Sequence, residues 1–346
     1  MAAGDAAGVV RHAASGYLPR RTPMIEYLLV FSLGLVGLYF GAEWLVRGAA
    51  RWARARGVSA VAVGLTIVAF GTSAPELVVS TVAAARAQVG VALGNVIGSN
   101  ILNVGLILGV ASVIRPLTVQ MRLVAGEVPL LIAVSVAVPL LALDGGFGRV
   151  DAAILLGGFV AYLGFVLRMA RRAPGLAEAT YLEFEAAESL EPRGETWRRD
   201  LLVMTAGLGA LALGAHAAVT GAVGVASAFG VSDLVIGLTV VAIGTSLPEL
   251  ATSVTATIRG EADIAVGNIV GSNLFNLLAI LGAAAAVRPL EVPIAFLRFE
   301  IPVMIGLSLL LWPIAWTRLR VERWEGGLLL AGFAAFQVWL IVRALA

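Results

Sequence analysis

The chain has 346 residues, of which 60% are hydrophobic and 13% charged, and its formal net charge is +2. Soluble domains usually carry about 25% charged residues, so the composition excludes a soluble globular protein. The chain has no cysteine, which excludes disulfides and thiolate metal sites.

Residues 1–23 are rich in Ala, Gly and Arg and lack the apolar core of a signal peptide. We expect a disordered tail there, unless translation begins at Met24. Beyond it, apolar windows recur with the length of about 20 residues that a helix needs to cross a bilayer. They lie at roughly 26–47, 58–84, 89–113, 124–143, 150–169, 200–226, 231–257, 262–287, 298–316 and 326–345.

These ten runs predict an all-α polytopic membrane protein. They do not alternate apolar and polar residues as barrel strands do, and the 40 glycines allow helices to approach closely. All 24 basic residues are arginine, and sixteen of them fall in the loops after odd-numbered spans. Cytoplasmic loops carry the arginine excess, so we expect both termini on the non-cytoplasmic side. We expect an integral protein of a prokaryotic inner membrane, with lipids and no nucleic acid as partners.

The chain contains one segment twice. Residues 64–117 align without a gap to residues 237–290, with 28 of 54 positions identical and a constant offset of 173. Each copy belongs to a five-span half, 24–169 or 200–346, and an acidic stretch at 170–199 reads as a solvated cytoplasmic linker. Five is an odd number, so the second half enters the membrane from the opposite side. Inverted repeats of this kind are typical of secondary transporters with a midplane site.

The string GTSAPE, residues 71–76, is the first unusual motif, and GTSLPE repeats it at 244–249. Pro75 lacks an amide hydrogen, so the helix is expected to kink or open near Gly71 and free backbone carbonyls. Together with Thr72, Ser73 and Glu76 these carbonyls form an all-oxygen cluster. Hard cations such as Ca²⁺ prefer such ligands. The equivalent residues of the second copy are Thr245, Ser246 and Glu249.

The second motif is GNVIGSNILN at 94–103, which returns as GNIVGSNLFN at 267–276. In each copy a serine and an asparagine lie four residues apart, on one helical face. These pairs are Ser99 with Asn103 and Ser272 with Asn276. Four further asparagines flank the pairs, too many for all to touch one ion: Asn95, Asn100, Asn268 and Asn273.

A structural role for the kink and the hydroxyls is the alternative, because interhelical hydrogen bonds in membranes contribute about 0.6 kcal/mol each. The glutamates favour function: a carboxylate inside a membrane costs at least about 2.5 kcal/mol on insertion scales. No Lys or Arg lies near Glu76 or Glu249 within these spans. We therefore predict that mobile cations neutralise the two carboxylates.

The paired motifs resemble the two α-repeats of the cation/calcium exchanger superfamily, and specifically its sodium/calcium exchanger branch. The resemblance implies that Glu76 and Glu249 share a central Ca²⁺ and also serve Na⁺ sites. It further implies oxygen ligands from the Thr and Ser residues above and from the carbonyls of Ala69 and Ala242. Asn103 matches the family's amide position. Its mate Asn276 stands where the family often has Asp, which leaves cation selectivity, stoichiometry and proton coupling open.

Exchange of Ca²⁺ for Na⁺ by alternating access is thus the predicted function, with no cofactor and no enzymatic activity. The first and sixth spans are expected to slide, an assignment that comes mainly from the resemblance and fits Gly34, Gly37, Gly41, Gly207, Gly209 and Gly214. The alternatives are a Ca²⁺/H⁺ antiporter, a cation channel, and a serine hydrolase, which would need a Lys or His base beside Ser73 or Ser246. The sequence does not indicate an oligomeric state.

Overall fold

The computed structural model describes residues 24–172, 197–230 and 242–345. The expected tail, most of the linker and the start of the seventh span lie outside these ranges. The described chain is almost entirely helical, with four two-residue strands. In the first half the elements are α2 Met24–Arg56, α3 Ala60–Val63, η1 Gly64–Val68, α4 Ala69–Thr72, α5 Ala74–Ala85, α6 Val89–Leu102, η2 Asn103–Leu108, α7 Gly109–Ile114, β1 Leu117–Thr118, η3 Leu123–Glu127, α8 Val128–Leu141, η4 Ala142–Asp144, β2 Gly146–Phe147 and α9 Arg149–Arg172.

The second half runs through the corresponding elements. They are α11 Trp197–Ala228, α13 Ala242–Gly244, α14 Leu247–Ile258, α15 Ala262–Phe275, η6 Asn276–Ile280, α16 Leu281–Val287, β3 Leu290–Glu291, η7 Phe296–Glu300, α17 Ile301–Trp316, η8 Thr317–Leu319, β4 Arg320–Val321 and α18 Arg323–Leu345. Among the η elements, η1, η2, η3, η6 and η7 are single π-helical turns. They interrupt longer helices, as such turns commonly do at functional sites.

The described residues contain eight helices long and apolar enough to cross a membrane, or nine if the bent pair Ala60–Thr72 and Ala74–Ala85 counts as one span. These nine correspond to nine of the ten predicted windows, and the all-α membrane architecture is confirmed. The remaining window, 231–257, is described only from Ala242 onward, where α13 and α14 lie.

The helix opens where Pro75 predicts it. The two parts of the bent pair meet at an angle of 47°. Ser73 separates them, with a ψ of 7° that departs from the helical value. Pro75 follows in the first turn of α5, where its missing N–H costs nothing because that group has no partner in the helix anyway. In the second copy Ser246 has a ψ of 11°, and Pro248 likewise lies in the first turn of α14.

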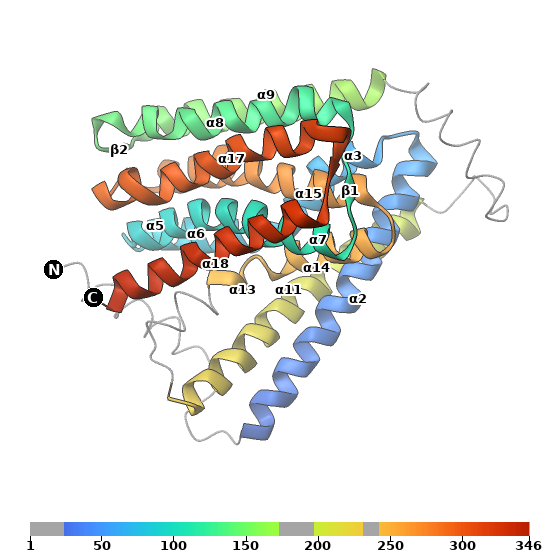
Figure 1. Cartoon of the computed structure of the whole chain (residues 1–346), viewed down its shortest axis with the longest axis horizontal. Helices are drawn as coiled ribbons and strands as arrows, with labels where there is room; N and C mark the ends of the chain where they lie inside the picture. Colours follow the sequence, from blue (N-terminus) through green and yellow to red (C-terminus); the bar gives the residue numbers. More distant parts are fainter. Residues whose placement is uncertain (1–23, 173–196, 231–241, 346) are drawn as a thin grey trace.

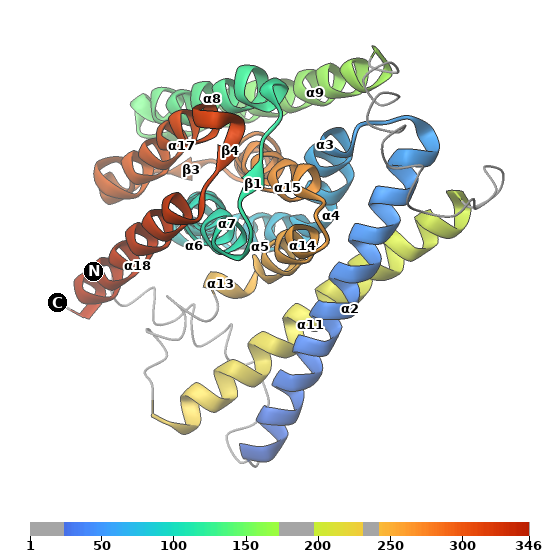
Figure 2. The same ribbon diagram turned by 45° about the vertical axis from the view of Figure 1, so that its right-hand side comes forward.

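The centre of the molecule is formed by α5 to α7 from the first half and α14 to α16 from the second (Figure 1). Helices α8, α9 and α17 lie on one side of this bundle, and α18 packs along α7 (Figure 1). On the other side the long helices α2 and α11 pack against each other and cross at an angle (Figure 2). Their contact depends on glycine: a Cβ at Gly41 would lie 2.7 Å from the nitrogen of Leu211, and one at Gly214 would lie 2.6 Å from that of Leu38. Gly209, also expected on this surface, has open space at its Cβ position.

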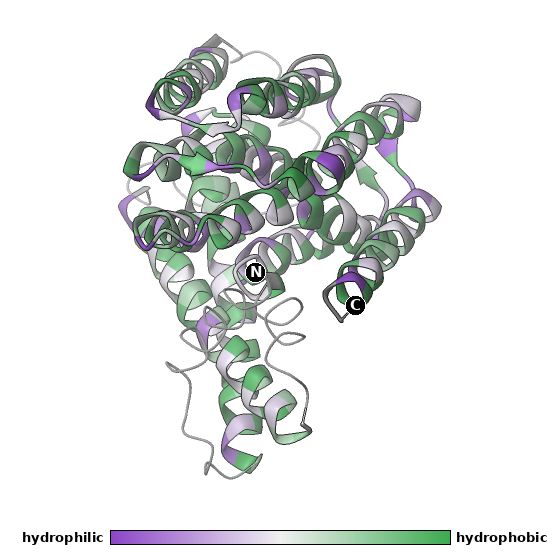
Figure 3. Ribbon diagram, turned by 90° about the vertical axis from the view of Figure 1, so that its left-hand side faces the viewer, coloured by the Kyte–Doolittle hydropathy of each residue, from purple (hydrophilic) through white to green (hydrophobic). Residues whose placement is uncertain are grey.

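The long helices are largely apolar along their length (Figure 3). Large apolar side chains remain exposed on the outer helices, as expected of surfaces that face lipid. Along α2 the exposure changes with position. Leu33 and Tyr39 are 67% and 60% exposed, whereas Leu45 and Val46 are fully buried. The beginning of α2 therefore projects from the bundle while its second half packs against it (Figure 1).

Two short strand pairs connect the halves. Strand β1 pairs with β4 and β2 pairs with β3, both antiparallel, with Leu117 opposite Val321 and Phe147 opposite Leu290. The pairs lie at opposite ends of the bundle (Figure 1). Each pair therefore joins a connection of one half to a connection of the other.

Candidate functional site

Four polar stripes meet in the centre of the bundle, two from each half. In each stripe the residues are spaced by four, as on one face of a helix, and Thr72 and Thr245 lie just before the breaks at Ser73 and Ser246. The stripes are Thr72, Glu76 and Ser80; Thr245, Glu249 and Ser253; Asn95, Ser99 and Asn103; and Asn268, Ser272 and Asn276. Ten of these twelve side chains are at most 4% exposed, and only Asn95 and Thr245 are partly exposed. The sequence predicted most of this cluster, and the structure brings its members together.

Each carboxylate receives a hydrogen bond from the opposite half. Ser73 donates from its Oγ to Oε1 of Glu249 over 2.7 Å, and Ser246 donates to Oε1 of Glu76 over 2.9 Å. The same hydroxyls lie 3.0 Å from the Oγ of Ser272 and 3.3 Å from that of Ser99. The two halves thus contribute equal sets of oxygens to one site, and neither half could form the site alone.

The second oxygen of each carboxylate has no partner. Oε2 of Glu76 and Oε2 of Glu249 are buried without a hydrogen bond. Neither glutamate takes part in an ion pair with any arginine or histidine that the structure describes. A buried ionised carboxylate without a partner is strongly disfavoured, so the pair is suited to binding a cation.

The amides Asn103 and Asn276 add two further free acceptors. Each is the first residue of a π-helical turn, η2 or η6, and each has a buried Oδ1 without a partner. Asn103 donates its Nδ2 proton to Oδ1 of Asn273 at 3.0 Å, which leaves its own carbonyl oxygen available. Carboxylate, amide and hydroxyl oxygens together form an all-oxygen site that fits a hard cation.

Two of the flanking asparagines, to which the sequence alone assigns no role, connect the stripes. Asn268 accepts a hydrogen bond from Thr72 at 3.2 Å and donates one to Ser253 at 3.0 Å. Asn95 mirrors it, accepting from Thr245 at 3.3 Å and donating to Ser80 at 2.8 Å.

Asn95 also donates to the backbone carbonyl of Glu76, 3.2 Å away. The signal for these contacts was present in the spacing, because Ser80 and Ser253 continue the stripes of Thr72 and Thr245 by one more helical turn. Asn95 and Asn268 therefore hold the first motif of one half against the second motif of the other.

The two predicted carbonyl ligands lie in the helices that precede the breaks at Ser73 and Ser246. The carbonyl of Ala69 accepts hydrogen bonds from the backbone nitrogen of Ser73 at 3.0 Å and from the Thr72 hydroxyl at 3.3 Å. Ala242 is the first residue of α13. Within the described ranges there is no group of three or more His, Cys, Asp or Glu side chains able to hold a metal ion. A bound cation would therefore depend on two carboxylates supplemented by neutral oxygens.

Residues 26–168 and 200–342 match the family model described as sodium/calcium exchanger protein. The two matched segments coincide with the two halves, and the residues between them are those of the linker. The match covers well over half of the chain.

Two relatives cover nearly the whole chain. The putative antiporter CaxA of Alkalimonas amylolytica is 40% identical over 320 residues, covering 92% of this chain and 99% of that protein. The sodium/calcium exchanger MaX1 of Methanosarcina acetivorans is 33% identical and covers 90% of this chain and 97% of its own length. Among solved structures, the sodium-calcium exchanger NCX_Mj superposes with a TM-score of 0.77 at 31% identity, covering 92% of this chain and 99% of that one.

Proposed function

Because the chain belongs to the sodium/calcium exchanger family, we propose that it exchanges Ca²⁺ for Na⁺ across the membrane by alternating access. The proposed substrates bind at the four polar stripes, where Glu76 and Glu249 supply the charge. The Ser and Thr hydroxyls and the amides of Asn103 and Asn276 supply neutral oxygens. The chain is a transporter and not an enzyme.

One observation carries this proposal: two buried carboxylates, one from each half, each with one oxygen unpartnered. Their combined charge of −2 balances one Ca²⁺ or two Na⁺. Like charges within a few ångströms repel strongly at low dielectric, so full occupancy by both substrates at once is unfavourable. Without any substrate the doubly charged site resists crossing the membrane interior, which couples the two fluxes.

We further propose ten spans arranged as two inverted repeats. The contacts support this arrangement because they come in pairs offset by 173, such as Ser73 with Glu249 and Ser246 with Glu76. Ser135 and Ser308, equivalent positions of the two halves, lie 3.2 Å apart through their hydroxyls. A residue can contact its own counterpart only beside the axis that relates the halves.

Radiocalcium uptake into proteoliposomes tests the coupling ion. With vesicles loaded with Na⁺ and diluted into choline medium, we expect uptake well above that of vesicles without a Na⁺ gradient. Uptake should persist when a protonophore is added and the voltage is clamped with K⁺ and valinomycin. Uptake that requires a pH gradient and ignores Na⁺ would instead establish Ca²⁺/H⁺ exchange. Calcium current without any counter-ion would establish a channel.

A further inference from the structure

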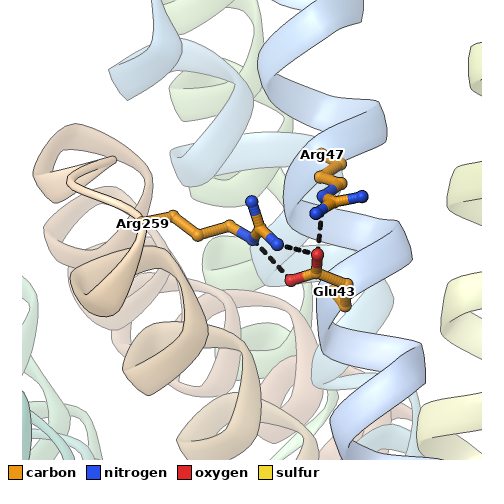
Figure 4. Close-up of polar contacts among 3 residues, drawn as sticks. All are labelled: Glu43, Arg47 and Arg259. Carbon is orange, nitrogen blue, oxygen red and sulfur yellow. Dashed lines mark hydrogen bonds and ion pairs between the residues drawn. The ribbon is translucent and has the colours of Figure 1, made fainter.

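Glu43, in the middle of α2, is held by two arginines. Its side chain is buried although α2 lies at the edge of the bundle. Arg259 donates from Nε to one carboxylate oxygen and from Nη2 to the other, and Arg47 lies 2.6 Å from the second oxygen through its Nε (Figure 4). Arg259 directly follows α14, the helix that begins with the GTSLPE motif and carries Glu249. The ion pair therefore joins α2 to the helix of the cation site.

A second ion pair joins α2 to α11. Arg51 donates from Nε to Oδ1 of Asp200 over 2.9 Å, and Asp200 is 2% exposed. Together with the close glycine contacts between the two helices, this pair makes α2 and α11 one unit. Glu43 then anchors that unit to the bundle. Both ion pairs involve the second half of α2, the part that packs against the bundle.

The equivalent positions of the other half keep the arginine but lack the acid. Shifting by 173 converts Glu43 into His216 and Arg259 into Arg86. Both side chains are exposed, and neither takes part in an ion pair among the described residues.

The same shift converts Arg51 into Gly224 and Asp200 into Tyr27, which contact each other closely: a Cβ at Gly224 would lie 2.0 Å from the Tyr27 ring. Among the residues that the structure describes, the ion pairs that join α2 to α11 and α14 lie in the second half of α2.

The acid–arginine pair is present in only one of the two halves. If the protein works by the alternating access proposed above, the two access states are not equally stabilised. In such a transporter the two access states exchange the environments of the two halves. In the opposite state α11 would lie closer to Arg86, with His216 facing it, and Glu43 would be separated from Arg259. We propose that the Glu43–Arg259 ion pair is a latch that stabilises the access state seen here and has no counterpart in the opposite state.

The latch predicts an unequal population of the two states in the absence of ions. To leave the present state the protein must break the partly exposed ion pair between Glu43 and Arg259. In the opposite state no equivalent ion pair forms, because His216 stands where an acid would be needed opposite Arg86. Removal of either charge should shift the equilibrium towards the opposite state. Introducing an acid at His216, opposite Arg86, should shift it in the same direction by stabilising that state.

Spin labels can measure the two states without transport, so this test stands apart from the identity of the coupling ion. The chain lacks cysteine, and cysteines introduced at Leu33 on α2 and Val150 on α9 would be exposed labelling sites. We expect one dominant distance in the otherwise unaltered chain. Glu43→Gln or Arg259→Gln should raise the second distance population by about twofold to fivefold. His216→Glu should raise it too, unless Arg86→Gln is added.

The exchanged pair Glu43→Arg with Arg259→Glu should restore the original distribution, which a merely steric role would not do. Glu26→Gln, which removes an exposed acid from the same helix, is the matched control and should change nothing. Unchanged distances in both Glu43→Gln and Arg259→Gln would overturn the proposal, as would failure of the exchanged pair to restore the distribution. If Glu43→Gln or Arg259→Gln does not fold, the distance distributions of the other single variant and of the exchanged pair still test the proposal.

Discussion

Neutralising one carboxylate should abolish most of the affinity for Ca²⁺. Glu76 and Glu249 are 1% and 2% exposed, and each keeps one oxygen free of hydrogen bonds. Removing one partner from a buried, hydrogen-bonded charge interaction typically costs about 2 to 5 kcal/mol. At about 1.4 kcal/mol per tenfold, Glu76→Gln or Glu249→Gln should weaken Ca²⁺ binding by about 30-fold or more. The two variants should behave alike because their carboxylates have equivalent surroundings.

Thermal unfolding in detergent, with and without Ca²⁺, measures this directly. A ligand that binds only the folded protein stabilises it, by about 2.7 kcal/mol at a concentration one hundred times its Kd. The unaltered protein should therefore melt at a higher temperature in Ca²⁺, and either variant should lose most of that shift. Without ions the variants should be at least as stable as the parent, since one of two repelling charges is gone.

Glu127→Gln is the matched control. Glu127 is another buried glutamate of a membrane-spanning segment, 1% exposed, but it lies 3.4 Å from Arg122 through its Oε1 and outside the four stripes. Its variant should keep the Ca²⁺-dependent shift. The site reasoning would be refuted if Glu76→Gln and Glu249→Gln retained the full shift, or if Glu127→Gln lost it to the same extent.

Three further changes test other parts of the structure. Asn276→Asp adds a third carboxylate where one Ca²⁺ balances only two, so the exchange rate should depend more steeply on pH than that of the parent. Gly214→Val should lower stability by about 1 to 3 kcal/mol through overpacking against α2, whereas Gly209→Val, with open space at its Cβ, should leave the melting temperature nearly unchanged. Asn268→Ala should destabilise the protein by about 1 to 3 kcal/mol, because it leaves buried hydrogen-bonding partners unpaired. The loss should exceed that of Asn95→Ala, since Asn268 is fully buried and Asn95 is not, and the melting temperatures of the two variants test this.

Much of the architecture and of the candidate site could be predicted because membrane insertion leaves strong signals. Each span must be apolar over about 20 residues, so nine predicted windows correspond to described helices or helix pairs. Polar residues are costly there, so the few present at repeated positions had to serve a common purpose. The contacts between Ser73 and Glu249, and between Ser246 and Glu76, were not readable individually. They depend on how the two halves face each other.

Other features had no distinct signal. The π-helical turns that begin at Asn103 and Asn276 depend on one extra residue in a helical turn, which changes neither hydropathy nor propensity. The role of Asn95 and Asn268 could have been inferred by extending the stripes to Ser80 and Ser253, since the spacing of four continues there. Glu43 lies inside the predicted span 26–47 and Arg259 lies just after the predicted span 231–257, and nothing in the sequence pairs them. Only the packing of α2 against α14 brings them together.

The two strand pairs determine which parts of the molecule can move. One pair hydrogen-bonds the connection at Leu117 to the connection at Val321. The other pairs Phe147 with Leu290 at the opposite end of the bundle. Sliding one half past the other would break main-chain hydrogen bonds at both ends simultaneously. The elements other than α2 and α11 should therefore behave as a rigid frame. Any motion that admits ions first from one face and then from the other is left to the crossed helices outside the frame, α2 and α11.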